Sequence, residues 1–245
     1  MQYLVEVKNL KKNYGAKEAV KGISFKINDN EILGLLGPNG SGKTTTIGMM
    51  LGLLKPSNGE IIIDGKKIEE NRIEILKKIN FISPYIELPK KLTVKQNLIV
   101  YGKLYSVSDI KKRIEYLSEK LRLGDLLGKI TGELSSGQKN RVSLAKALIN
   151  KPKVLLLDEP TASLDPEIGD FVRTFLEDYK KEKKISILLA SHNMNEVTRL
   201  CKSTLMMKDG VIIDSGSPQE LISKHGRKNL EEVFLKLTRS NNELN

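Results

Sequence analysis

The sequence contains no tryptophan, only one cysteine and no long apolar run. The lone Cys201 excludes a framework of intramolecular disulfides and fits a reducing, cytoplasmic setting. No stretch reaches the roughly 18 consecutive apolar residues that a membrane helix requires. Residues 1–12 alternate apolar and charged side chains and lack the apolar core of a signal peptide. We therefore expect a chain that neither crosses a membrane nor carries an export signal.

Positive charge is in excess. The 245 residues include 41 Lys or Arg and 30 Asp or Glu, which gives a formal net charge of +11. Such an excess suits nucleic acid, an anionic membrane surface or simply a water-exposed surface. The charged run at residues 180–184 mixes both signs and has no interleaved aromatic side chains. We interpret the excess mainly as solvated surface charge, and a nucleic-acid-associated protein is the alternative.

Short apolar segments alternate with segments of helical periodicity. The segments that read as strands are 4–7, 23–27, 32–36, 61–63, 80–82, 154–157, 185–190 and 205–207. The segments that read as helices are 45–54, 93–105, 108–123, a stretch ending at Asn150, and two capped helices in the tail. Strands that are apolar on both faces and alternate with helices predict a largely parallel sheet. Helices between two sheet-forming parts predict an inserted helical subdomain.

The strongest motif lies at residues 37–44, which match G-x-x-x-x-G-K-[ST] at every fixed position. Glycines allow backbone N–H groups to curl around phosphate oxygens, and the helix that follows adds the positive end of its dipole. Lys43 then reaches the β- and γ-phosphates, and the Thr44 hydroxyl helps to hold Mg²⁺. A ligand-free glycine turn is the alternative, but the flanking strand and helix favour a phosphate loop. The candidate nucleotide-binding residues here are Asn39, Gly40, Ser41, Gly42, Lys43, Thr44 and Thr45.

Two carboxylates follow the apolar strand at 154–157. Ligands bind at the carboxyl ends of strands in parallel α/β sheets, and Asp158 and Glu159 lie at such an end. We expect Asp158 to hold Mg²⁺, through water, and Glu159 to orient and polarise the attacking water. Alone, two acids in a loop would be weak support; behind a phosphate loop in the same sheet they predict nucleotide hydrolysis.

The segment Leu134-Ser135-Ser136-Gly137-Gln138 predicts the start of a helix. Ser135 is placed to cap it, and the Gln138 side chain is placed to return the hydrogen bond. The exposed N–H groups of such a helix end also suit a phosphate.

Together these motifs resemble the nucleotide-binding domains of ATP-binding-cassette (ABC) transporters. The resemblance covers about residues 4–217 and is carried by GPNGSGKTT at 37–45, LSSGQ at 134–138, VLLLDEP at 154–160, SLD at 163–165, and His192. It implies an α/β P-loop NTPase core with a largely parallel sheet, an N-terminal antiparallel β portion and an inserted α-helical subdomain. The corresponding divisions are a core at 1–83 and 154–217, a helical subdomain at 84–153, and a helical tail at 218–245.

The resemblance also implies roles for individual residues. Tyr14 matches the aromatic residue that stacks on adenine, Asp165 the loop acid that couples two sites, and His192 the histidine that contacts the γ-phosphate. Ser135, Gly137 and Gln138 match residues that bind the γ-phosphate of ATP held by the opposite subunit. Lys43, Glu159 and His192 would then be catalytic, and Thr44 and Asp158 would serve Mg²⁺. Two subunits would close head to tail around two ATP molecules.

One position departs from the family pattern. The family usually has a glutamine after the strand at 80–82, where it contacts Mg²⁺ and faces the membrane partner. Counting back from residues 92–94 places Pro84 there. Proline offers no side-chain ligand, and Mg²⁺ readily retains waters that can fill the vacancy. Ser83 is the alternative ligand if the loop is shifted by one residue.

The resemblance implies an ATP-hydrolysing subunit that powers transport through a separate integral-membrane partner, attached to the inner face of the membrane. Residues 229–238 resemble the tails of subunits that serve exporters, which favours export. The second subunit is either a copy of this chain or a related one. The alternatives are a soluble ABC-type ATPase of a cytoplasmic assembly, a nucleic-acid-associated ATPase, and a non-catalytic binding module. Intact Lys43, Asp158 and Glu159 oppose the last of these.

Overall fold

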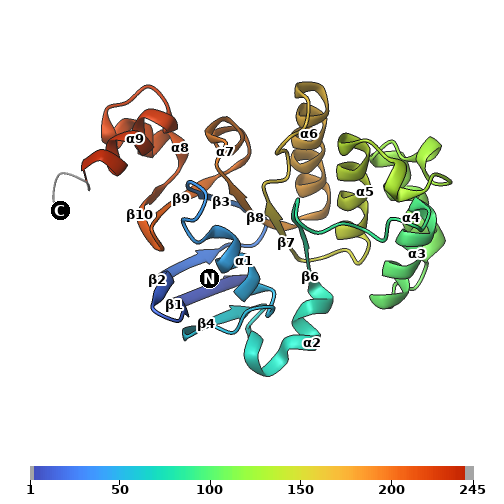
Figure 1. The fold of residues 1–245 in the computed structure, drawn as a ribbon, viewed down its shortest axis with the longest axis horizontal. Helices are drawn as coiled ribbons and strands as arrows, with labels where there is room; N and C mark the ends of the chain where they lie inside the picture. Colours follow the sequence, from blue (N-terminus) through green and yellow to red (C-terminus); the bar gives the residue numbers. More distant parts are fainter. Residues whose placement is uncertain (1–2, 241–245) are drawn as a thin grey trace. The chain divides into compact units, whose positions relative to one another are not determined.

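A computed structural model describes residues 3–240 of the protein. The chain divides into two compact units, one built from the residues up to Ile75 with those from Ser186 onward, and the other from Leu76 to Ile185 (Figure 1). The fold is the predicted mixture of parallel and antiparallel sheet with helices. The residue limits predicted for the core, the helical subdomain and the tail stay predictions.

The first unit begins with an antiparallel sheet in the order β2-β1-β4-β5. Its strands are β1 (Val5–Tyr14), β2 (Lys17–Ile27), β4 (Asn58–Ile63) and β5 (Lys66–Lys67). Val5 pairs with Ile27, and Val7 with Phe25, and these four side chains are buried. Alternate residues of an extended strand point to opposite faces, so this pairing puts one apolar face of the sheet into the core.

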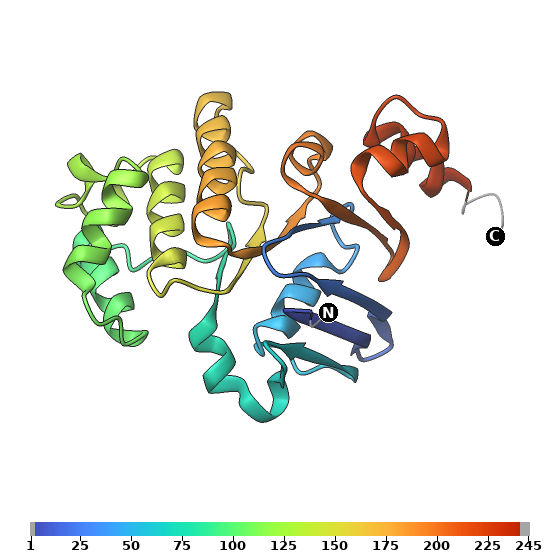
Figure 2. The same ribbon diagram turned by 180° about the vertical axis from the view of Figure 1, so that it is seen from behind.

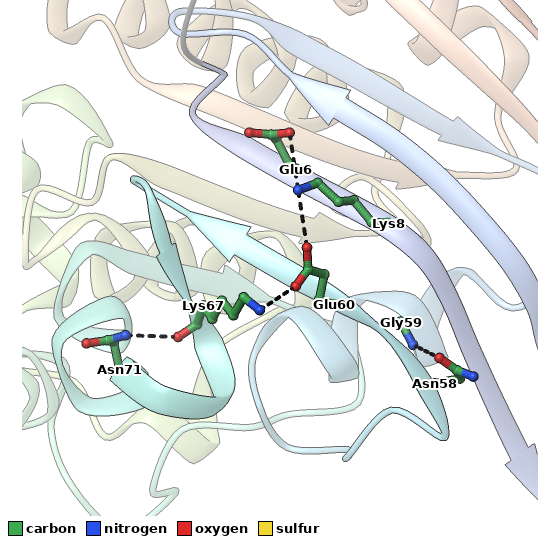
Figure 3. Close-up of polar contacts among 7 residues, drawn as sticks. All are labelled: Glu6, Lys8, Asn58, Gly59, Glu60, Lys67 and Asn71. Carbon is green, nitrogen blue, oxygen red and sulfur yellow. Dashed lines mark hydrogen bonds and ion pairs between the residues drawn. The ribbon is translucent and has the colours of Figure 1, made fainter.

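The other face of this sheet carries an ion-pair cluster centred on Glu60 (Figure 3). The Glu60 carboxylate accepts from Lys67 Nζ at 2.8 Å and from Lys8 Nζ at 3.2 Å, so it links β1, β4 and β5. The hydrogen bond from Lys67, followed by that from Lys8, lowers the pKa of Glu60. All three side chains are substantially exposed, and exposed ion pairs contribute little to stability. The cluster therefore matches charges across neighbouring strands without anchoring the fold.

A second sheet of this unit is built around β3 (Ile32–Leu36). It pairs in parallel with β8 (Ser186–Ser191) on one side and with β9 (Ser203–Lys208) on the other, and β10 (Val211–Gly216) pairs antiparallel with β9. All residues of β3 and β8 are buried. Burial on both faces explains why these strands are continuous apolar runs in the sequence.

Short helices complete the first unit: α1 (Lys43–Met50), α7 (Met194–Leu200), α8 (Pro218–His225) and α9 (Leu230–Ser240). The predicted cap of α8 is confirmed, because Ser217 and Glu220 exchange side-chain and backbone hydrogen bonds. Leu230, Val233 and Phe234 on α9 are buried, and α9 contacts α7 and α8. The helices of the tail therefore pack on their own unit. One further helix, α2 (Ile68–Lys78), runs from this unit into the next.

The second unit contains β6 (Ile79–Ile82) and β7 (Val154–Asp158), which pair in parallel. Its longer helices are α3 (Val94–Leu104), α4 (Ile110–Lys120), α5 (Ser136–Leu148) and α6 (Pro166–Lys183), and two short 3-10 turns lie at Gly124–Leu126 and Thr131–Glu133. Figures 1 and 2 show α3, α4 and α5 side by side, with α6 next to α5. The helices predicted at 93–105 and 108–123 are thus confirmed as α3 and α4. Within residues 3–240, no helix combines the length and apolar character needed to cross a membrane.

A buried lysine holds α5 against β6. Lys146 on α5 is only 8% exposed, and its Nζ donates to the Phe81 carbonyl oxygen at 3.1 Å. The same ammonium lies 4.9 Å from the centre of the Phe81 ring and 5.6 Å from that of Tyr101. Burial lowers the pKa of Lys146 to about 8 from an ordinary 10.5. The two rings and the carbonyl offset only part of the cost of removing this charge from water.

We predict that Lys146 makes stability rise with pH in the alkaline range. Between about 8 and 10.5 the unfolded chain holds a proton on this lysine that the folded chain releases, so unfolding becomes less favourable as the pH rises. Relative to Lys146→Met, the free energy of unfolding of the wild type should increase by up to about 3 kcal/mol over this interval. Urea titrations at each pH would measure it. Lys103→Met, on the exposed side of α3, should follow the wild type; parallel curves for all three proteins would contradict the prediction.

Candidate functional site

The phosphate loop leaves β3 and enters α1 with its helix end uncapped by any side chain. The N-cap residue Gly42 has φ 108° and makes no side-chain cap hydrogen bond, and the first turn contains no acidic residue. Gly40, at φ +81°, has no atom within 4 Å of the place where a side chain would begin. The first N–H groups of a helix lack intrahelical partners. This loop therefore presents backbone donors and the positive end of α1 to an anion.

Lys43 is folded back over the loop that precedes it. Its Nζ donates to the carbonyl oxygens of Gly37, at 2.6 Å, and Pro38, at 3.1 Å, and the residue is 5% exposed. The Thr46 hydroxyl donates to the Gly42 carbonyl at 2.9 Å. Ser41 is buried, and its hydroxyl oxygen has no hydrogen-bond partner among residues 3–240. Asn39, Gly40 and Thr44 are exposed along the loop and the first turn, and Thr45 is half-buried.

Gly37 sits where only a hydrogen atom fits. A Cβ on this residue would lie 2.2 Å from the Met207 carbonyl oxygen of β9 and 2.8 Å from Ser41 Oγ. The Gly37 N–H also donates to the Ser191 carbonyl oxygen at 3.3 Å. The close approach of the backbones explains the first glycine of the motif.

His192 lies beside the start of this loop. It follows β8, whose last residue, Ser191, is opposite Leu36 in the parallel register. Because Gly37 N–H donates to Ser191, the chain enters both loops from the same edge of the sheet. The structure thus brings the predicted phosphate loop and the predicted histidine together within one unit. His192 itself is exposed.

Residues that sequence reasoning missed hold the His192 loop in place. The Ser191 hydroxyl donates to Glu196 Oε2 at 2.8 Å and accepts from Asn193 N at 3.0 Å, and Glu196 is 2% exposed. Asn193 caps α7 by accepting from the backbone of Asn195 and Glu196. The signal was present in the sequence: Asn193 followed three residues later by Glu196 matches the start of a capped helix.

Tyr14 ends β1 and is 48% exposed. Lys12 Nζ lies 5.2 Å from the centre of its ring. An exposed aromatic face of this kind can receive a planar base, whereas a tyrosine of the core could not. Tyr14 is therefore not a core side chain, and its stacking on adenine stays a prediction.

The second unit contains a cleft of about 310 Å³ that includes the predicted catalytic carboxylate. Glu159 lines it, together with Ser136 at the start of α5 and the two loop residues Ser83 and Pro84. Glu159 has φ +51°, a left-handed conformation that is uncommon for a residue with a side chain. Asp158, directly before it, ends β7 and is 2% exposed. Asn140 on α5 donates to the Pro160 carbonyl oxygen at 2.7 Å and so ties the carboxylate loop to α5.

Pro84 lies in this cleft, at the place where the family usually has glutamine. Ser83 lines the same cleft, and its hydroxyl accepts weakly from Tyr85 N at 3.4 Å. Residues 83 and 84 therefore contribute one side-chain hydroxyl and no side-chain amide to the cleft.

The two remaining motifs both begin helices. Ser135 caps α5: its hydroxyl accepts from Gln138 N at 3.3 Å, and Gln138 Oε1 accepts from Ser135 N at 3.0 Å. The predicted exchange of hydrogen bonds is confirmed. Asp165 caps α6 by accepting from Ile168 N at 3.0 Å, a structural role that the sequence reading did not assign. Gly137 is buried, and a Cβ there would lie 3.2 Å from the Ile168 side chain. Roles of these residues toward nucleotide stay predictions.

The ABC transporter family matches residues 20–162 of the chain. The chain belongs to the ABC transporter family. The predicted family is confirmed, and with it the ATP-binding, ATP-hydrolysing class of the chain.

Individual relatives of this ABC family chain cover most of its length. It is 36% identical over 221 residues, 89% of each chain, to the ABC transporter ATP-binding protein NatA of Bacillus subtilis (strain 168). It is 36% identical over 232 residues to the Nod factor export ATP-binding protein I of Rhizobium sp. (strain N33), covering 94% of this chain and 76% of that one. The bacitracin transport ATP-binding protein BcrA of Bacillus licheniformis is 34% identical over 234 residues, with 94% and 75% covered.

Solved structures of ABC proteins have the same fold as this chain. The structure of an ATP-binding subunit of an ABC transporter matches with a TM-score of 0.88 at 27% identity, covering 96% of this chain and 99% of the other. A dimeric ATP-binding cassette in a post-hydrolysis state, bound to ADP and Pi, matches with a TM-score of 0.80 at 27% identity, with 87% and 98% covered.

We predict that Gly37→Ala lowers the free energy of unfolding much more than Gly40→Ala does. The first substitution drives a methyl group into the Met207 carbonyl, at a cost of about 3 kcal/mol or more. The second places its methyl group in open space, and its cost of about 1 kcal/mol comes only from the positive φ of residue 40. Urea unfolding of both variants and the wild type, without nucleotide, would measure the free energies. Equal losses would mean that the close approach of β9 does not constrain the loop.

Proposed function

We propose that this ABC chain hydrolyses MgATP to ADP and phosphate and thereby drives export through a separate integral-membrane subunit. The observation that carries the proposal is the phosphate loop, whose helix end has no side-chain cap and whose lysine is already turned over the loop. The family supplies the transport context.

ATP is held by donors that other elements position. The triphosphate occupies the loop formed by Asn39–Thr45, where Lys43 exchanges its bonds to carbonyl oxygens for phosphate oxygens. Adenine stacks on the exposed ring of Tyr14. His192 reaches the γ-phosphate from the loop after β8, and its backbone is fixed by the Ser191–Glu196 hydrogen bond.

The donor atoms of the candidate ligands suit Mg²⁺ by their chemistry. The ion prefers oxygen ligands and retains several waters, and the two candidate donors are the Thr44 hydroxyl and the Asp158 carboxylate. Asp158 is 2% exposed, and a buried carboxylate is stabilised in its charged form by a nearby cation. When bound, the ion offsets negative charge on the phosphates. Pro84 adds no ligand, so we assign water, with Ser83 nearby, to the position that glutamine usually fills.

Hydrolysis requires a base that faces a space open to water. Glu159 lines the cleft of about 310 Å³ in its unit. We assign it the proton of the attacking water: a water oxygen bonds to the γ-phosphorus, the proton passes to the Glu159 carboxylate, and the bond to the β-phosphate oxygen breaks to release ADP. Lys43 and His192 stabilise the charge on the transferred group.

Two chains complete each site in this proposal. Ser135, Gly137 and Gln138 at the start of α5 contact the γ-phosphate bound by the opposite subunit, and Asp165 couples the two sites. The dimeric cassette among the similar structures supports this arrangement. The relative named for Nod factor export supports an exporter attached to the inner face of the membrane by its partner, and the relative named for bacitracin transport supports a transport role.

We predict that Glu159→Gln stops turnover but keeps ATP bound. Losing the base should lower the steady-state ATPase rate about 10²–10⁴-fold. Uncleaved ATP should then hold two subunits together, which size-exclusion chromatography with light scattering would detect. Glu167→Gln, an exposed carboxylate in the first turn of α6, is the matched control and should retain the wild-type rate. Near-normal turnover by Glu159→Gln would refute the assigned base.

The transport half of the proposal has a separate test. We expect affinity purification of this chain from detergent-solubilised native membranes to recover a polytopic membrane protein in stoichiometric amount. Recovery only from the soluble fraction, with cytoplasmic proteins or RNA, would leave the ATPase assignment standing and overturn export.

A further inference from the structure

A second cavity lies in the helical unit, away from the cleft that contains Glu159. It has a volume of about 440 Å³ and shares no lining residue with that cleft. The start of α4, the loop before β7 and the end of α6 form its walls. Its volume falls in the range of small-molecule sites. None of the motifs discussed above accounts for it.

The lining of this cavity is basic. It includes four cations, Lys112, Arg113, Lys151 and Lys183, and one acid, Asp109. Asp109 already serves as the cap of α4, where its carboxylate accepts from Lys112 N at 3.0 Å. Lys183 is paired with Glu182, at 2.6 Å. Lys112 and Lys151 have no ion-pair partner among the residues that the structure describes.

Arg113 is the buried member of this set. It is 6% exposed, and one terminal nitrogen donates to the Leu148 carbonyl oxygen at the end of α5 and to the Tyr179 hydroxyl at 2.9 Å. Its Nε is buried and lacks a hydrogen-bond partner within residues 3–240. Leaving a donor of a buried charged group unsatisfied is costly. By bonding both α5 and α6, Arg113 has a structural role that accounts for the burial of one terminal nitrogen. This role does not account for the unbonded Nε or for the two lysines that lack an ion-pair partner in the described chain.

Two aromatic residues line the cavity beside these cations. Tyr116 lies with its ring centre 5.2 Å from the Arg113 guanidinium and 5.0 Å from Lys183 Nζ. Tyr179 is buried and accepts from Arg113. Pro152 adds an apolar surface. The cavity therefore combines a wall of rings with a concentration of donors, which suits an anion carried by a compact organic group.

We infer that this cavity binds the phosphoryl group of a small molecule. A guanidinium offers the planar fork of donors that phosphate oxygens accept, and lysines add mobile charge at the rim. Arg113, which lines the cavity, supplies the guanidinium, and Lys112 and Lys151 supply the ammonium groups. The site is independent of the proposed ATPase chemistry, because none of its residues belongs to the nucleotide motifs.

The test uses a signal from a residue that lines the cavity, so that phosphate bound at the P-loop does not contribute to the measured binding. Tyrosine ring signals in NMR spectra of the full-length, ring-labelled protein would be followed during titration with pyrophosphate. Tyr116→Phe identifies the Tyr116 signals by their loss. A parallel titration with glycerol phosphate and a separate one with vesicles of anionic phospholipid distinguish a free phosphorylated molecule from a lipid headgroup.

Charge reversal at the rim supplies the decisive comparison. We expect saturable shifts of the Tyr116 signals in the wild type, and at least a tenfold weaker affinity in Lys112→Glu/Lys151→Glu. The matched double variant Lys111→Glu/Lys181→Glu changes net charge equally at exposed positions outside the cavity, and it should bind as the wild type does. The rim is changed rather than Arg113, because removing Arg113 would also break its bonds to Leu148 and Tyr179.

Three results would overturn the inference. One is the absence of saturable Tyr116 shifts with either soluble phosphate. Another is an equal loss of affinity in both double variants, which would indicate general charge attraction. The third is binding to the vesicles alone, which would indicate a membrane contact.

Discussion

The parallel pairing of β3 with β8 and β9 determines where this protein can hold a nucleotide. Leu36 lies opposite both Ser191 and Met206, so the chain leaves β3 and β8 at one edge of the sheet. The Met207 carbonyl then approaches Gly37 so closely that no side chain fits. With the start of the loop fixed in this way, Lys43 can fold back onto the carbonyls of Gly37 and Pro38. The position of the lysine thus follows from backbone packing against the neighbouring strand β9.

The way in which helices begin distinguishes α1 from six other helices of the described chain. Thr93, Asp109, Ser135, Asp165, Asn193 and Ser217 each cap the helix that follows them with a side chain. At α1 the cap residue is Gly42, which has no side chain to offer. Helix ends need partners for their first N–H groups. Six helices are capped by a side chain, whereas α1 has no side-chain cap and leaves its first N–H groups to a ligand.

Much of this arrangement could be predicted from the sequence because local chemistry determines it. The strand expected at 32–36 is β3 with the same limits, and the Ser135 and Gln138 bonds follow from their spacing. Other features depend on tertiary contacts. Helix α2 is largely polar and interrupted at Asn71, and β10 has no buried residue, so neither shows a clear period. The support of His192 by Glu196 requires a carboxylate to be buried, which is a property of packing rather than of pattern.

The net charge of +11 also combines what composition shows with what only tertiary contacts show. Composition counts charged side chains but not their partners, and it led to a reading of solvated surface. Lys8 and Lys67 fit that reading, since both are exposed and both neutralise Glu60. Arg113 does not fit it, because it is buried and keeps a nitrogen without a hydrogen bond in the described part of the chain. Water solvates an exposed ammonium group at little cost, whereas a buried guanidinium nitrogen without a hydrogen bond is costly. The excess charge is therefore of two physical kinds: exposed ammonium groups that water and carboxylates satisfy, and buried cations, of which Arg113 lines the cavity that we assign to an anion.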